Sequence, residues 1–499
     1  MKKRVERLRG MHDLLPDIYQ RQHHTIEQLG AFLARAGYDR VDAPLLENSD
    51  LFLASFGQEL WQNLYTFRLH NRDLCLRPEY TASICRLYLD HYQHSPLPLR
   101  FQYAGPVFRY ETPGRGRYRQ HTQLGVELLG GHATSADSEI LQLACDALNE
   151  VRIPNYRLEL GHVGVASGFI QRLRLDEQAA RLLLSLMEQI SRSQEGEQAA
   201  HARLEMLYPA ETVEAQNSNT ARDAGERFLT SLLNGMTALN TNDASRQEII
   251  DRFLWKMGRS EQRRQILYAL DLLRELHGAA GSPPEAFGAL RDILSRYQID
   301  AAPLAELEQL VTVVEQSGVP RERITLNLAL GRGVSYYTGL VFEIHAQDAE
   351  GYDTQICGGG RYDSLMQAIG ATRPVKACGF TFGVERLLAL IPEEEFPASS
   401  ATQAIIIPIS AQDMPYALQV ARAARAQGVR AEIDITGHGL SAGLKLAVKK
   451  HITHALIVGE NEAREERVTL RNLASGEEHS YELNAAMRHM RDKERINEL

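Results

Sequence analysis

The stretch FRYETPGRGRYRQHTQ, residues 108–123, carries four arginines within eleven positions: Arg109, Arg115, Arg117 and Arg119. Apolar runs flank the stretch, LRFQYAGPVF before it and LGVELLG after it. This pattern predicts two buried strands joined by an arginine-rich loop. Guanidinium groups bind phosphate through paired hydrogen bonds, so such a hairpin can aim arginines inward at an anion. A solvated charged turn is the alternative for the loop taken alone.

Two further segments place an arginine beside glycines, which let a backbone approach a ligand closely. In LGRGVSYYTGLVFEIH, residues 330–345, Arg332 lies between two glycines ahead of a predicted strand, although a strand-entry turn is equally compatible. In ICGGGRYDSLMQAIGA, residues 356–371, the three glycines predict a tight, closely packed turn. CGFTFGVERLLALI, residues 378–391, predicts a strand that runs into a helix. Arg386 is near the start of that helix, where N–H groups favour anions, or else lies on its surface.

Composition narrows the class of protein. The chain has 499 residues, 44% hydrophobic and 24% charged, which predicts an ordinary globular protein of two to four domains. A net charge of −9 gives no global signal of nucleic-acid binding. No run is long and apolar enough for a signal peptide or a membrane span. The five cysteines form no C-x-x-C pair, so we expect no disulfide framework, no zinc ribbon and a cytoplasmic location. P-loop and H-E-x-x-H motifs are also absent from the sequence.

The pattern along the chain predicts several elements. Helical spacing follows residues 17–36, a strand is interrupted at Pro44, and a hairpin turns around residues 70–73. A helix is predicted from Thr81, with that threonine as its cap, and another over 136–151. Residues 163–320 are rich in Leu, Ala, Gln, Glu and Arg and predict a mostly helical insertion. After the charged joint PEEEFPASS, apolar strands alternate with helices, which predicts a small α/β domain.

In their order, these motifs resemble those of the class II aminoacyl-tRNA synthetases, and specifically the histidyl branch. YDRVDAPLLE resembles motif 1, FRYETPGRGRYRQHTQLGVE motif 2 and GFTFGVERL motif 3, while RGVSYYTGLVFE and CGGGRYDSL resemble the two histidyl signatures. The resemblance implies an α+β fold with an antiparallel-sheet catalytic core. Its implied parts are a core over 1–162 and 321–392, a helical insertion over 163–320, a linker over 393–402 and an α/β anticodon-binding-like domain over 403–499.

The resemblance also implies a function and a set of site residues. The expected reaction is ATP-dependent activation of L-histidine followed by transfer to tRNA(His), in a cytoplasmic homodimer whose interface includes motif 1. Mg²⁺ is expected on the phosphates of ATP. Arg109 and Arg332 match catalytic positions. The ATP-binding positions are matched by Arg109, Glu111, Arg117, His121 and Arg386, and the histidine-binding positions by Glu79, Thr81, Gln123, Glu127, Arg332, Tyr336, Tyr337 and Tyr362.

Several residues depart from the family pattern. Asp is usual at Ser335, Gly at Tyr80, His at Thr122, and an adenine-stacking Phe at His121. LELGHVGVASGF instead resembles a catalytically silent relative, the regulatory subunit of ATP phosphoribosyltransferase. The alternative is therefore a histidine-binding regulatory protein with a phosphoribosyltransferase partner. That relative normally lacks the C-terminal domain that this chain has. In that domain three lysines cluster along one predicted helix and could contact phosphates or form a solvated helix face: Lys445, Lys449 and Lys450.

Overall fold

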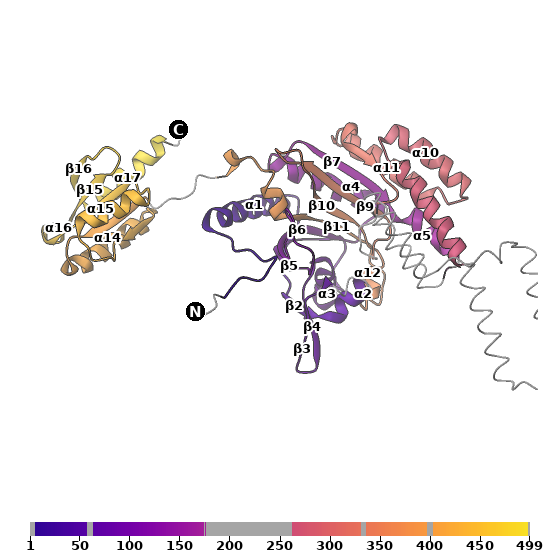
Figure 1. Ribbon diagram of the computed structural model, residues 1–499, viewed down its shortest axis with the longest axis horizontal. Coiled ribbons are helices and arrows are strands. Elements are labelled where there is room, and N and C mark those ends of the chain that lie inside the picture. The colour runs from indigo at the N-terminus through magenta and orange to yellow at the C-terminus, as the bar shows by residue number, and fades with distance from the viewer. Residues whose placement is uncertain are drawn as a thin grey trace, which may run out of the picture. The chain divides into compact units, whose positions relative to one another are not determined.

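The computed structural model describes residues 5–56, 63–173, 175, 262–330, 336–396 and 403–497. The chain divides into two compact units, Met1–Glu395 and Phe396–Leu499, each with its own sheet (Figure 1). In the described ranges no helix is long and apolar enough to cross a membrane.

The larger unit is built on an eight-stranded sheet of order β1-β5-β6-β11-β10-β9-β7-β8. The four strands at its centre, and β5 and β7 beside them, pair antiparallel, whereas β1–β5 and β7–β8 pair parallel. This confirms the predicted antiparallel core. The strands are β1 Asp39–Arg40, β5 Leu99–Phe108, β6 Gln120–Leu129, β7 Tyr156–His162, β8 Ile324–Leu326, β9 Leu340–Gln347, β10 Asp353–Arg361 and β11 Ala377–Gly383.

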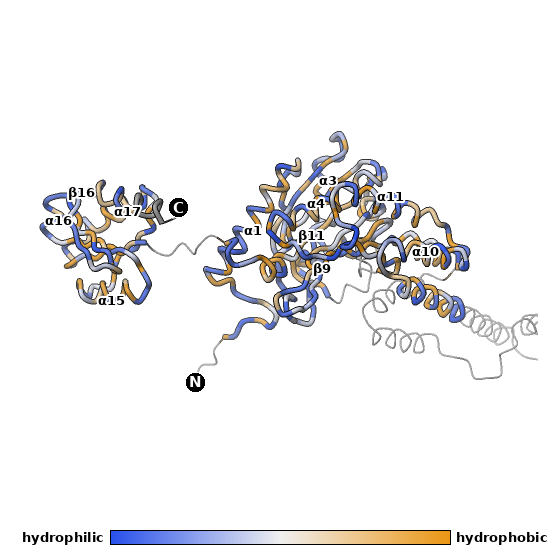
Figure 2. The backbone as a smooth tube through the Cα atoms, turned by 90° about the horizontal axis from the view of Figure 1, so that it is seen from above, coloured by the Kyte–Doolittle hydropathy of each residue, from blue (hydrophilic) through white to orange (hydrophobic). Residues whose placement is uncertain are grey.

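Three helices pack against one another and against this sheet. Helix α1 (Pro16–Arg35) contacts β5, α4 (Ala133–Glu150) contacts β11, and α11 (Ala302–Gln316) contacts β7. Figure 2 shows hydrophilic and hydrophobic residues mixed along α1, whose buried positions recur at helical spacing. Such a helix covers a sheet with its apolar stripe and leaves the other side to solvent. The predicted helices over 17–36 and 136–151 are therefore confirmed within a few residues.

Helix α3 (Thr81–His91) packs against α2 (Ser49–Phe56) and α12 (Leu365–Ala368) beside a small sheet of order β2-β4-β3. Its strands are β2 Leu46–Asn48, β3 Thr66–Leu69 and β4 Arg72–Leu76. The predicted hairpin turns at His70 and Asn71, which take φ of 45° and 62°. The predicted strand break at Pro44 is also present, between β1 and β2.

Two local predictions were wrong. The Thr81 side chain does not cap α3, because its hydroxyl donates instead to Glu127, and the N–H groups of the first turn bind the Glu79 carboxylate. The three glycines over 358–360 lie inside strand β10 rather than in a turn. Gly359 packs there against Phe342 and a neighbouring backbone, so the close packing that suggested a turn occurs within the sheet.

Of residues 163–320, the described parts are helical: α5 Val163–Arg172, a helix over 262–278, α10 Pro283–Arg296 and α11. The remainder of the predicted insertion lies outside the described residues, so its boundaries stay a prediction. Two short helices complete this unit: α12, and α13 Val384–Leu388 after β11.

The second unit is an α/β domain with a five-stranded sheet of order β13-β12-β14-β15-β16. Its three parallel strands are β12 Ala404–Pro408, β13 Ala431–Ile433 and β14 His454–Val458, followed by antiparallel β15 Arg467–Asn472 and β16 Glu478–Glu482. The helices are α14 Met414–Ala426, α15 Leu440–Lys449, α16 Glu460–Glu465 and α17 Leu483–Asn497. Alternating apolar strands and helices thus form the predicted domain.

Candidate active site

Glycines make room for a site on one face of the large sheet. Glu127 on β6 lies opposite Gly379 on β11, which lies opposite Gly360 on β10. A Cβ atom at Gly379 would collide with the Glu127 carboxylate, and one at Gly125 would crowd the Tyr103 hydroxyl. Only glycine at these positions leaves space for polar side chains to lie across the sheet.

Glu127 is a buried carboxylate, only 1% exposed, held by three hydroxyl groups. The Thr81 hydroxyl donates to it at 2.7 Å and Tyr103 at 3.0 Å, and Tyr362 also donates. Burial, with a contribution from the negative charge of Glu79, raises the pKa of Glu127 to about 8 against the effect of these donors. The carboxylate therefore holds a proton at neutral pH unless a cation arrives.

Glu79 is a second buried carboxylate, immediately before helix α3. It accepts the backbone N–H groups of Thr81 at 2.5 Å and Ala82 at 2.9 Å. Burial raises the pKa of Glu79, while these hydrogen bonds and the charge of Arg109 act in the opposite direction. Two buried carboxylates, of which Glu79 raises the pKa of Glu127, are suited to sharing a cationic group such as an ammonium.

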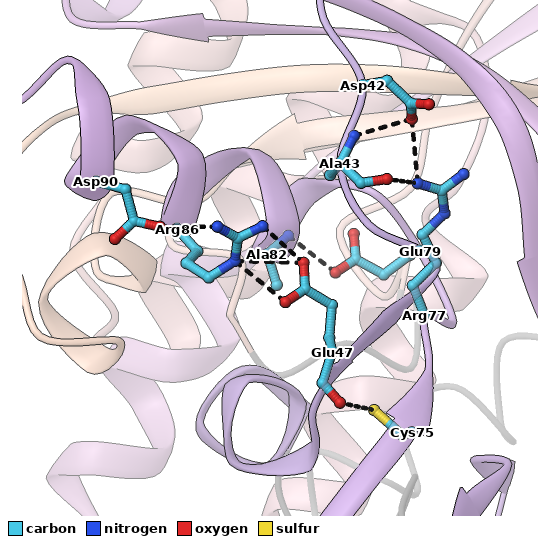
Figure 3. Close-up of polar contacts among 9 residues, drawn as sticks. All are labelled: Asp42, Ala43, Glu47, Cys75, Arg77, Glu79, Ala82, Arg86 and Asp90. Atoms are coloured by element: carbon cyan, nitrogen blue, oxygen red, sulfur yellow. Dashed lines mark hydrogen bonds and ion pairs between the residues drawn. The ribbon is translucent and has the colours of Figure 1, made fainter.

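Two arginine–carboxylate anchors hold the segment that carries Glu79 (Figure 3). Before α3, the fully buried Arg77 donates to Asp42 at 3.2 Å. Within α3, Arg86 binds both oxygens of Glu47 at 2.8–3.2 Å. Both acceptors lie in the chain from β1 to the start of β2, which is the stretch that resembles motif 1. That stretch therefore fixes the position of the Glu79 carboxylate from two sides.

Tyr80 takes part in the first anchor. Its hydroxyl donates to Asp42 at 3.0 Å and accepts from Arg77, and its ring stacks on Tyr103 with centroids 4.3 Å apart. Its hydroxyl therefore binds the motif 1 segment, whereas the hydroxyl of Tyr103 binds Glu127. The sequence marks Tyr80 only as a departure from the family pattern, and no local signal predicts this role, because Asp42 lies 38 residues away in the chain.

Three guanidinium groups lie near one another where β5, β6 and α13 meet. Arg386 donates to the carbonyl oxygen of Gly116 at 3.2 Å. Burial, followed by the positive charges of Arg117 and Arg109, lowers the pKa of Arg386. Glu111 lies 3.9 Å from Arg109 and partly offsets this positive charge. Arginines that repel one another in a partly buried site favour the binding of an anion.

The other two arginines of the loop do not join this group. Arg115 is exposed and forms ion pairs at 2.7 Å with Asp348 and at 2.7 Å with Glu350. The Arg119 guanidinium lies 4.0 Å above the ring of Tyr110. The prediction that the hairpin aims its arginines inward is therefore wrong for Arg115 and Arg119, because the loop turn sends their side chains in other directions.

His121, on β6 beside these arginines, is uncharged at neutral pH. Burial, and then the charges of Arg109 and Arg386, lower its pKa to about 3. Its Nδ1 lies 3.3 Å from the carbonyl oxygen of Tyr118, which assigns the ring proton to that nitrogen. A neutral imidazole here offers a flat ring without adding to the positive charge.

Aromatic residues enclose the space near Glu127. The rings of Tyr336 and Tyr362 lie 5.8 Å apart, and those of Tyr336 and Tyr337 4.9 Å apart. Gln123 is buried on β6, and its Oε1 atom has no hydrogen-bond partner among the residues that the structure describes. A buried acceptor without a donor is costly, so this amide is suited to a ligand. Arg332 lies outside the described residues, and its predicted catalytic role stays a prediction.

The site thus combines buried carboxylates at one part of the sheet face with three arginines at another. In the described ranges, no group of three or more His, Cys, Asp or Glu side chains is arranged to hold a metal ion. A ligand that carries both an ammonium group and phosphates fits the charges of both parts.

Comparison with known proteins gives two family matches. The model of the histidyl-tRNA synthetase family matches residues 10–241 and 254–387. The model of the anticodon binding domain matches residues 403–493. Together they cover most of both structural units.

Relatives are similar over nearly their full length. The chain is 31% identical to the histidine--tRNA ligase of Methanoregula boonei over 97% of this chain and 98% of the relative. It is 28% identical to that of Methanococcus maripaludis strain C6 over 95% and 97%. Among solved structures, the fold is similar to Staphylococcus aureus histidyl-tRNA synthetase (TM-score 0.62, 21% identity, 98% of this chain and 100% of that one). It is equally similar to an ATP phosphoribosyltransferase regulatory subunit/histidyl-tRNA synthetase from Bacillus halodurans (TM-score 0.62, 22% identity, 92% and 99%).

Proposed function

Because the chain belongs to the histidyl-tRNA synthetase family, we propose that it is a histidine--tRNA ligase. It activates L-histidine with ATP to histidyl-adenylate and transfers the histidyl group to tRNA(His). The observation that carries the proposal is the pairing of a buried two-carboxylate pocket with a cluster of three arginines on the same core. The first suits the ammonium group of an amino acid and the second the phosphates of ATP.

In this proposal Glu127 and Glu79 bind the ammonium group of histidine. Because the pKa of Glu127 is about 8 without ligand, arrival of the ammonium group releases a proton and leaves an ion pair. Thr81 orients the carboxylate through its 2.7 Å hydrogen bond. Gln123 supplies an acceptor, and Tyr336, Tyr337 and Tyr362 form the wall around the imidazole.

The arginines act on the phosphates. Arg109 is assigned to the α-phosphate and Arg386, with Arg117, to the outer phosphates. Arg109 donates to the carbonyl of Pro78 at 2.9 Å, and Pro78 is next to Glu79 in the chain. The same segment therefore positions the arginine for the α-phosphate and the carboxylate for the ammonium group. Fixed guanidinium groups stabilise the charge that develops on the transferring phosphorus without reorganising. By family resemblance, Arg332 aids attack of the histidine carboxylate.

ATP use follows from the family, and we propose that Mg²⁺ enters as part of the MgATP substrate. The described site has no three-ligand metal cluster, and Glu111 is the carboxylate beside Arg109. Phosphate oxygens and water therefore supply most of the coordination in this proposal, as Mg²⁺ often has it. The neutral ring of His121 takes the place beside adenine.

Partners and location are likewise proposals. The C-terminal unit, which matches the anticodon binding domain, would contact the tRNA. On α15, Lys445 and Lys449 are exposed, whereas Lys450 is bound to Glu432 at 2.8 Å, so the first two are the better candidates for phosphate contacts. The motif 1 segment would pair with a second copy in a cytoplasmic homodimer.

Histidine-dependent exchange between ATP and pyrophosphate tests the proposal. Exchange that requires histidine and is lost in Arg332→Ala and Glu127→Gln supports adenylate formation, and charging of tRNA(His) is the next assay. Arg321→Ala is a matched control, because that arginine forms an exposed ion pair with Glu315 away from the site. Saturable histidine binding without exchange would overturn the enzyme assignment and favour the regulatory-subunit alternative.

A further inference from the structure

The tip of the loop between β5 and β6 is a tight turn. Gly114 and Arg117 exchange two backbone hydrogen bonds of 3.1 and 3.0 Å, and Gly116 takes a φ of 63° that favours glycine. The turn places the Arg115 side chain toward solvent and the β9–β10 connection. It places the Gly116 carbonyl and the charge of Arg117 toward Arg386.

Arg115 binds the β9–β10 connection through three contacts. Its two terminal nitrogens bind Asp348 and Glu350, each at 2.7 Å, and its guanidinium lies 5.4 Å from the ring centre of Tyr352. Asp348 is prepared for this contact: its Oδ1 accepts the N–H groups of Glu350 at 3.0 Å and Tyr352 at 2.9 Å. Its Oδ2 therefore faces Arg115 from a carboxylate that is only 8% exposed.

The same hairpin also holds Arg386. Its Nε atom donates to the carbonyl of Gly116 in the loop, and its Nη1 atom donates to the carbonyl of Gln355 on β10 at 2.7 Å. Thus the β9–β10 hairpin binds the loop tip through the ion pairs of Arg115 and binds Arg386 through the carbonyl of Gln355. If the ion pairs of Arg115 break, the turn that carries Arg117 can move away from Arg386.

We propose that Arg115 is a positioning residue that holds the loop closed over the ATP site before ATP arrives. In this role it acts through its ion pairs with Asp348 and Glu350, which keep Arg117 and the Gly116 carbonyl at Arg386. This inference rests on the proposed function for its kinetic consequence, but the closure of the loop is measurable without it. Because the contacts are ion pairs with exposed members, the closure weakens as salt increases.

The kinetic test compares Arg115→Ala, Glu350→Gln and the double variant in ATP–pyrophosphate exchange. We expect the KM for ATP to rise about threefold to tenfold in Arg115→Ala, with the KM for histidine unchanged. Glu350→Gln should give a smaller rise and add nothing in the Arg115→Ala background. At 0.5 M salt the difference from the unmodified chain should shrink, and Arg115→Lys should recover part of the affinity. The remote control Arg321→Ala should leave the KM for ATP unchanged.

Hydrogen exchange of the ATP-free protein gives the second readout. Backbone N–H groups over 111–119 should exchange faster in Arg115→Ala than in the unmodified chain, while α3 is unaffected. An unchanged KM for ATP together with unchanged exchange over 111–119 would overturn the inference. Absence of pyrophosphate exchange in the unmodified chain would overturn the proposed function alone, because faster hydrogen exchange in Arg115→Ala would still support closure by Arg115.

Discussion

Replacing Glu127 by Gln gives the sharpest test of the ammonium pocket. The folded protein raises the pKa of this carboxyl from 4.5 to about 8. At 1.36 kcal/mol for each pKa unit, the difference corresponds to on the order of 5 kcal/mol favouring the protonated form in the folded state. The contribution to stability is fully present below pH 4.5, and it is lost as the pH rises through about 8, because the unfolded chain ionises first. Glutamine has no such titration.

Urea unfolding of the ligand-free protein between pH 5 and 8.5 measures this effect. We expect the unfolding free energy of the unmodified chain to fall with pH more steeply than that of Glu127→Gln. Glu139→Gln is a control: hydrogen bonding to Arg100 lowers the pKa of Glu139, so its contribution is lost only as the pH falls below 4.5, and this variant should keep the pH slope of the unmodified chain between pH 5 and 8.5. Identical pH slopes for the unmodified chain and Glu127→Gln would refute a buried, protonated Glu127.

Histidine binding reports the same carboxyl from the ligand side. At pH 7 the ammonium group should displace close to one proton from Glu127, and the affinity should increase with pH up to about 8. Calorimetry in two buffers of different ionisation enthalpy counts that proton. Glu127→Gln should bind histidine at least a hundredfold more weakly, because a buried ammonium without its carboxylate is costly. Tight binding by this variant would place the ammonium group elsewhere.

Three further variants test other parts of the site. Tyr80→Gly removes a buried ring and its bond to Asp42, so the free energy of unfolding in urea should fall by about 3–5 kcal/mol. Tyr80→Phe removes only the hydroxyl and should cost about 1 kcal/mol; no loss of stability in Tyr80→Phe would contradict the anchor. His121→Phe should leave the pH dependence of the KM for ATP between pH 6 and 8 unchanged, since the pKa of His121 is already about 3. Arg361→Met leaves the buried Asp137 unpaired and should destabilise the fold by about 3–5 kcal/mol, which the same urea measurement would detect.

Much of the core followed from local sequence patterns. Apolar runs on both sides of the arginine loop predicted the β5–β6 hairpin, because a strand buried beneath helices needs apolar residues and its connection needs glycine and charge. The alternation after residue 403 predicted the second sheet for the same reason. These features depend on neighbours close in sequence, which a single chain displays directly.

The parts that failed depend on distant partners. The Thr81 hydroxyl donates to Glu127, 46 residues further along the chain, instead of capping its own helix, and no local sequence pattern predicts that partner. The ion pair between Arg115 and Asp348 could not be predicted either, because a turn more than 200 residues further along the chain orients the Asp348 carboxylate. Residue types and motif order therefore identified the members of the site, while their division of roles required the tertiary structure.

That division explains why an acidic chain concentrates arginine in one loop. If all four guanidinium groups faced one point, their repulsion would oppose folding, and a site without ligand has no anion to offset it. The fold instead neutralises Arg115 with two carboxylates and places Arg119 on an aromatic ring. The repulsion that remains lowers the pKa of Arg386 and is relieved when an anion binds. A polyphosphate relieves this repulsion more fully than a single negative charge, because its charges can meet several guanidinium groups at once. The repulsion among the three arginines therefore favours a polyphosphate substrate over a simple anion.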